Sequence, residues 1–159
     1  MNHVAYVTWN TAETVRFYTD VLGMRLVGHA TGDETSTGPS SRFLHTFFEM
    51  EDGSCVAFFE IDGVDRETHV SPVPNWARHL ALNVGSLDEL ESWTQRLRAN
   101  DVDVISRDHG TWKSIYFFDP NAIRIELTYQ VRPLGEADAA AAAVALERWT
   151  AEHATAASR

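Results

Sequence analysis

Two histidines and one glutamate have the residue types and sequence contexts expected of a metal site. His3 begins the apolar segment 3–8, His79 lies in the similar segment 78–84, and Glu126 lies among apolar residues in the segment 123–129. A carboxylate that faces an apolar interior is costly in free energy unless it meets a cation or a metal ion. Two imidazoles and one carboxylate with open coordination positions are the ligand set of many non-haem Fe(II) sites.

A further histidine, His45, lies among aromatic residues in the segment 43–49. In an extended strand it shares a face with Phe43 and Phe47. This pattern predicts either a buried, hydrogen-bonded histidine or a donor in a pocket for a flat ring. The candidate substrate-binding residues are therefore His45, Phe47, Phe59 and Trp112, although aromatic side chains also pack in cores.

These segments belong to a pattern of predicted strands and helices that occurs twice. Alternating and β-branched apolar residues predict strands, and apolar residues at helical spacing predict helices. The predicted elements of the first half are a strand at 3–8, a helix at 11–22, and strands at 25–29, 43–49 and 55–61. Those of the second half are a strand at 78–84, a helix from Ser86 or Asp88 to Asn100, and strands at 102–106, 114–118 and 123–129. Each half therefore has the order β-α-β-β-β.

The two halves align with two different offsets. The first strands match at an offset of 76 residues, which places His3 opposite His79. The final hairpins match at an offset of 69 residues, which places Ala57 opposite Glu126. The seven additional residues of the first half fall in the polar segment 31–41, which predicts a long loop.

The repeat predicts an α+β fold for most of the chain. We expect residues 1–131 to form one domain of two tandem βαβββ modules, with module one at 1–62 and module two at 76–131. Residues 132–159 form a tail with an Ala-rich stretch, which predicts a helix by intrinsic propensity. Trp149 in this helix is a candidate contact for a homodimer.

Composition and charge exclude several classes of partner. The chain has 13 basic and 23 acidic residues, for a net charge of −10. This charge repels nucleic-acid phosphates and anionic membrane surfaces, and no apolar run approaches the roughly 20 residues that span a bilayer. A single cysteine, Cys55, cannot form an intrachain disulfide, and the first residues lack a signal peptide. We therefore expect a cytoplasmic protein.

The chain resembles the vicinal oxygen chelate superfamily, which includes glyoxalase I, extradiol ring-cleaving dioxygenases and bleomycin- or fosfomycin-resistance proteins. The resemblance rests on the two modules, on VRFYTDVLGM at 15–24, and on SIYFFDPN at 114–121 running into IEL at 125–127. It covers residues 1 to about 131. It implies metal ligands on the first and last strands of the modules, which here are His3, His79 and Glu126.

The resemblance makes the residue opposite Glu126 informative. Glyoxalase I has an acidic ligand at that position, whereas this chain has Ala57, which cannot bind a metal. The nearest acid, Glu60, is three residues further on and falls on the opposite face of a regular strand unless a β-bulge shifts it. A metal with three protein ligands and one open side resembles the metal site of the extradiol dioxygenases.

The leading hypothesis is an Fe(II)-dependent extradiol-type dioxygenase that cleaves a catechol-like aromatic ring with O₂. The metal would bind and orient both reactants. His109 and Tyr116 resemble the histidine and tyrosine beside the metal in extradiol enzymes, and they would transfer protons. The resemblance also allows another divalent metal, such as Mn, Ni or Zn.

Two alternatives remain open at this point. One is a glyoxalase-like isomerase or lyase that uses Ni, Zn or Co, with Glu60 as a fourth ligand. The other is a metal-free protein that binds an aromatic antibiotic between its modules. A buried carboxylate at Glu126 counts against the second alternative, because a metal-free site does not need one.

Overall fold

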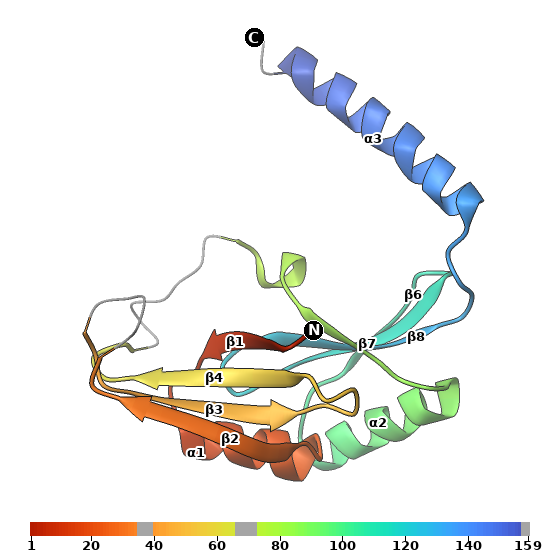
Figure 1. Cartoon of the computed structure of the whole chain (residues 1–159). Helices are drawn as coiled ribbons and strands as arrows, with labels where there is room; N and C mark the ends of the chain where they lie inside the picture. The colour runs from red at the N-terminus through yellow and green to blue at the C-terminus, as the bar shows by residue number, and fades with distance from the viewer. Residues whose placement is uncertain (35–39, 66–72, 157–159) are drawn as a thin grey trace.

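The computed structural model describes residues 1–34, 40–65 and 73–156 (Figure 1). These residues form two four-stranded sheets with two helices, α1 and α2, on the same side and a third helix, α3, that projects away from them. Parts of the predicted long loop (35–39), of the connector between the modules (66–72) and of the tail (157–159) lie outside the described residues.

The first sheet is built from module one and has the strand order β1-β4-β3-β2. Its strands are β1 (His3–Val7), β2 (Arg25–Gly32), β3 (Phe43–Glu49) and β4 (Cys55–Ile61). β1 is parallel to β4, and the other pairs are antiparallel. Helix α1 (Thr11–Arg16) follows β1 and continues as a π-helical turn at Phe17–Val21.

The second sheet is built from module two and has the equivalent order β5-β8-β7-β6. Its strands are β5 (Leu80–Asn83), β6 (Ile105–Asp108), β7 (Trp112–Phe118) and β8 (Arg124–Gln130), with α2 (Leu87–Ala99) after β5. A 3₁₀ turn (Asn75–Ala77) precedes β5. β5 is parallel to β8, so the predicted α+β fold of two tandem βαβββ modules is confirmed.

Strand register confirms the alignment of the two halves. Ala5 of β1 lies beside Ala57 of β4, and Ala81 of β5 lies beside Glu126 of β8. These pairs reproduce the offsets of 76 and 69 residues, so Ala57 is the structural counterpart of Glu126.

One face of each sheet packs against the helices and contributes to a core that both modules share. The largest fully buried core side chains are Tyr18, Phe48, Phe58, Leu97, Ile115, Phe117 and Ile125. Because side chains alternate along a strand, the residues between them point to the opposite side of the sheet. We call that side the open face; the strand residues His3, Ala57, Tyr116 and Glu126 belong to it.

Three local predictions differ from the structure. β2 extends to Gly32 because its backbone pairs with β3 as far as Phe43, although the residues are typical of a loop. β6 begins at Ile105 instead of residue 102, because Val102 and Val104 pack against the core. The predicted helix 11–22 changes at Phe17 to π-helical hydrogen bonding, and its N-cap is Asn10, whose side chain accepts the Glu13 N–H.

The tail forms the predicted helix, α3 (Glu136–Ala156), which stands apart from the sheets in Figure 1. A bidentate ion pair between Arg132 and Asp138 (2.7 and 2.6 Å) joins the preceding segment to its first turn. Val144, Leu146 and Trp149 are exposed. Among the described residues, no helix combines the length and apolar character needed to cross a membrane.

Candidate metal and substrate site

His79 and Glu126 meet on the open face of module two. His79 immediately precedes β5, and the parallel pairing of Leu80 with Ile125 places it at the level of the start of β8. Its Nε2 lies 2.9 Å from Glu126 Oε2. Glu126 is only 7% exposed, although it lies on the face away from the helices. An imidazole nitrogen and a buried carboxylate that already face each other fit the donor chemistry of a divalent metal.

Tyr116 and His109 lie beside this pair. Tyr116 is directly opposite Glu126 in the β7–β8 pairing, and its OH is hydrogen-bonded to His109 Nε2 at 3.0 Å. A tight turn at Gly110, with a φ of +79°, connects β6 to β7 and lets His109 reach back to β7. Burial, followed by the hydrogen bond and negative charge of Glu126, raises the pKa of Tyr116. The structure thus brings together four of the predicted site residues in module two.

His3 belongs to a separate cluster on the open face of module one. The His3 ring packs edge-on against Phe47 and His45, with centroid separations of 5.4 and 6.1 Å. His45 stacks on Phe59 at 3.5 Å, so the predicted association of His45 with aromatic residues is observed. Burial, and secondarily the nearby His3, lowers the pKa of His45. The His45 Nε2 atom is buried and has no hydrogen-bond partner among the residues that the structure describes.

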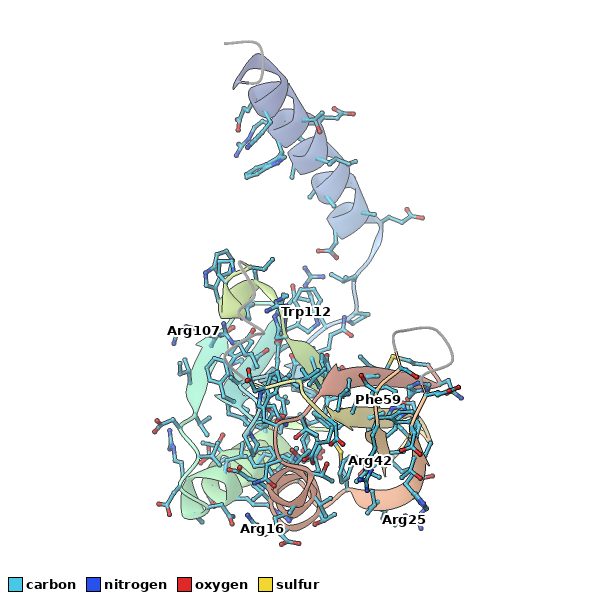
Figure 2. All side chains as sticks on the ribbon, turned by 90° about the vertical axis from the view of Figure 1, so that its left-hand side faces the viewer. Arg16, Arg25, Arg42, Phe59, Arg107 and Trp112 are labelled. Atoms are coloured by element: carbon cyan, nitrogen blue, oxygen red, sulfur yellow. The ribbon has the colours of Figure 1, made fainter. Side chains whose placement is uncertain are left out.

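The structure does not bring His3 to the His79–Glu126 pair within one chain. Throughout the described ranges, no three His, Cys, Asp or Glu side chains lie close enough to hold a metal ion. Trp112, at the start of β7, is likewise on a different sheet from Phe59 of β4, and Figure 2 shows the two side chains in separate parts of the molecule. Each chain therefore presents two partial sites.

Glu60 is held away from both partial sites. Its Oε2 accepts the backbone N–H of Thr11 at 2.8 Å, at the start of α1. The β3–β4 pairing is regular from Phe43 to Glu49, so no bulge moves Glu60 to the face of Ala57. The alternative with Glu60 as a fourth metal ligand has no support from this geometry.

Arg78 and Arg124 were not among the site residues predicted from the sequence. Both line a pocket of about 580 Å³ with His79. The Arg124 guanidinium lies over the Tyr116 ring, 4.2 Å from its centroid. Strand parity was the available signal, because Arg124 is two residues before Glu126 and faces the same side of β8.

Comparisons with known proteins agree with the fold. Residues 1–127 match the model of a family described as the Glyoxalase/Bleomycin resistance protein/Dioxygenase superfamily. The chain is 28% identical over 130 residues to the metallothiol transferase FosB of Staphylococcus haemolyticus, covering 80% of this chain and 81% of that protein. It is 30% identical over 121 residues to the lactoylglutathione lyase of Haemophilus influenzae, covering 71% and 79% of the two chains.

A solved structure has the same fold. The fosfomycin resistance protein FosX from Listeria monocytogenes, complexed with Mn(II) and sulfate ion, superposes with a TM-score of 0.57 at 20% identity. The match covers 82% of this chain and 92% of that one.

Proposed function

The chain belongs to the Glyoxalase/Bleomycin resistance protein/Dioxygenase superfamily, and from this premise we propose that it is a metal-dependent enzyme of the transferase or lyase type that acts on a small molecule. The observation that supports this best is the 2.9 Å contact between His79 and the buried Glu126, with the hydrogen-bonded Tyr116 and His109 beside it. The relatives named as a metallothiol transferase and a lyase agree with this class of activity.

His79 and Glu126 would be two of the metal ligands. Nitrogen and carboxylate donors suit Mn, Zn, Ni or Fe(II), and a manganese complex of FosX agrees with this range. A divalent metal bound there would polarise a substrate oxygen and hold the substrate in place. Tyr116, through its OH, would exchange a proton with the substrate, and His109 Nε2 would pass that proton to solvent.

The third ligand in this proposal is His3 of a second copy. His3 is exposed on the open face of module one, away from the His79–Glu126 pair of its own chain. In a two-fold dimer, contact of module one with module two of the other copy occurs twice, so two equivalent sites form. His45, Phe47 and Phe59 would then line the side of each site near His3.

A ring-cleaving dioxygenase with Fe(II), O₂ and an aromatic substrate is the second candidate. Ala57 favours it, because an alanine opposite Glu126 leaves a side of the metal without a protein ligand. The relatives named above favour transferase or lyase chemistry. O₂ uptake with a catechol panel, measured beside thiol transfer and lyase assays on the same metal-loaded protein, distinguishes the two candidates.

A mixing experiment tests the shared site. His3→Ala and Glu126→Ala each remove a ligand, so neither variant alone should retain a bound metal ion. In the mixed dimer, one site has both substitutions and the other has neither. An equal mixture that is unfolded and refolded together should therefore recover about a quarter of the wild-type metal content per chain. Recovery of no metal, from a mixture that light scattering shows to be dimeric, contradicts a site shared between copies.

A further inference from the structure

A pocket of about 580 Å³ lies where the two modules meet, next to the candidate metal ligands. Tyr6, Val7 and Trp9 line it from module one. Residues 77–79 and 121–124 line it from module two. His79, which contacts Glu126, is part of its wall, so a molecule in this pocket would adjoin the proposed metal site.

The charge of this pocket is opposite to that of the chain. Its lining includes Arg78 and Arg124 and contains no Asp or Glu. The chain as a whole has 23 acidic and 13 basic residues. In the part of the chain that the structure describes, the recorded ion pairs involve neither arginine. Two guanidinium groups with no carboxylate partner favour an anion from outside the chain.

Arg124 is oriented by its neighbours. Its guanidinium lies 4.2 Å from the centroid of the Tyr116 ring, at the start of β8 on the open face. Stacking on an aromatic ring occupies the flat face of a guanidinium and leaves its N–H edge available for hydrogen bonds. That edge can bind two oxygens of one oxyanion.

Arg78 lines the pocket and belongs to the segment that also contains His79. It lies between the 3₁₀ turn (Asn75–Ala77), which is closed by a hydrogen bond from Ala77 N–H to Pro74 O, and His79. Arg78 and His79 are adjacent in the chain, so an anion held by Arg78 and Arg124 would lie beside the proposed metal ligand.

We propose that this pocket binds the anionic group of the substrate, an oxyanion such as a phosphate, phosphonate or carboxylate, through Arg78 and Arg124. The proposal rests on the proposed function only for its link to the metal-bound part of the substrate. Two cationic groups match a doubly charged tetrahedral oxyanion better than a singly charged carboxylate.

The test measures anion binding to the full chain after chelation of all metal, by calorimetric titration with inorganic phosphate, methylphosphonate and acetate. Wild type is expected to bind phosphate or methylphosphonate with a Kd on the order of 1 mM or tighter, and acetate more weakly. Arg124→Gln and Arg78→Gln should each weaken binding about tenfold. Arg124→Lys keeps the charge and should give an intermediate loss, because a lysine cannot make the two parallel hydrogen bonds.

Arg16→Gln is the matched control, because it removes the same charge from the helix side of module one, where Figure 2 shows Arg16 far from the open faces. It should bind phosphate as wild type does. Absence of anion binding to wild type, or equal weakening by Arg16→Gln and Arg124→Gln, overturns the proposal. Stronger binding of acetate than of phosphate overturns the preference for a doubly charged group.

Metal content of the same variants separates this inference from the proposed function. Arg124→Gln should bind metal as wild type does, because the arginine is not a ligand. A protein that binds metal and no anion contradicts the anion pocket alone, whereas one that binds phosphate and no metal contradicts the metal-dependent function alone.

Discussion

Ala57 and Glu126 occupy the same position in the two modules. Ala57 lies opposite Phe47 in the β3–β4 pairing, and Glu126 lies opposite Tyr116 in the β7–β8 pairing. The repeat is therefore symmetric in backbone and asymmetric in chemistry, because at these matched positions module one has an alanine and a phenylalanine where module two has a carboxylate and a phenol. In the proposed metal site, the carboxylate ligand therefore comes from Glu126 of module two.

Substitution of Glu126 should affect metal content, whereas substitution of Glu60 should affect stability only. Glu126→Gln removes a charged oxygen donor and should lower metal affinity by more than 100-fold, since even changes around the ligands cost 10- to 100-fold. Glu60→Gln should leave metal affinity unchanged, because Glu60 accepts the Thr11 N–H at the start of α1. It should lower the free energy of unfolding by only about 0.5 kcal/mol, because the glutamine oxygen can still accept the Thr11 N–H but the negative charge at the start of the helix is lost.

Metal content after dialysis and urea unfolding of both variants provide the two measurements. Loss of metal in Glu60→Gln with retention in Glu126→Gln would indicate that module one supplies the ligand. That result would also require a register of β4 different from the regular one described here.

Tyr116→Phe should separate catalysis from metal binding. The substitution removes the hydroxyl that is hydrogen-bonded to His109 and keeps the ring under Arg124. If that hydroxyl transfers a proton, kcat should fall about 100-fold, within the range for general acid–base groups. Metal content and KM should change little. An unchanged kcat, measured with the substrate that the activity assays identify, assigns Tyr116 a packing role only.

Much of the fold follows from sequence pattern. The repeat of strands and helices and the helix that follows Ser86 both agree with the structure. The differences arise where tertiary pairing decides local structure. Gly32, for example, is part of a strand because β3 offers it a partner, and no local residue preference indicates this.

The individual residues of the candidate site were predicted from the sequence, but their arrangement in space was not. Spacing identified His79 and Glu126, and the structure places them in contact. Spacing also identified His3, but the alignment of the two modules says only that His3 and His79 are equivalent. It does not say whether two equivalent positions face each other within one chain or between two. That depends on how the modules pack, and their contact includes the Phe17 ring of module one against the Phe117 ring of module two.

Stability should decrease as pH rises through the titration of Asp119. This carboxyl group is buried and accepts the Tyr18 OH at 3.2 Å across the two modules. Burial raises its pKa above the usual 3.8, and the hydrogen bonds from Ile123, Asn121 and Tyr18 offset only part of that rise. Between 3.8 and the raised pKa the unfolded chain has already lost the proton that the folded protein retains. The free energy of unfolding therefore falls as pH rises in this window.

The comparison of wild type with Asp119→Asn isolates this effect, because other carboxyl groups titrate equally in both proteins. Urea unfolding from pH 4 to pH 7 should show the difference in free energy between wild type and variant shifting in favour of the variant as pH rises. A difference that does not change with pH would mean that Asp119 has the same pKa in the folded and unfolded states.

The helix content of the first turn of α3 should decrease as the pH falls, which is the opposite of the dependence expected for Asp119. Arg132 makes a bidentate ion pair with Asp138, and the Gly135 N–H also donates to this carboxylate. These contacts lower the pKa of Asp138 well below its usual value, so their contribution is fully present above about pH 4 and is lost as the pH falls toward the lowered pKa. Asp138→Asn should reproduce at neutral pH the loss of helix that is expected for wild type in acid. Far-ultraviolet circular dichroism of both proteins measures it, and Glu147→Gln, further along the same helix, is the matched control. Equal helix content in wild type and Asp138→Asn at pH 7 would mean that the alanine-rich sequence alone maintains α3.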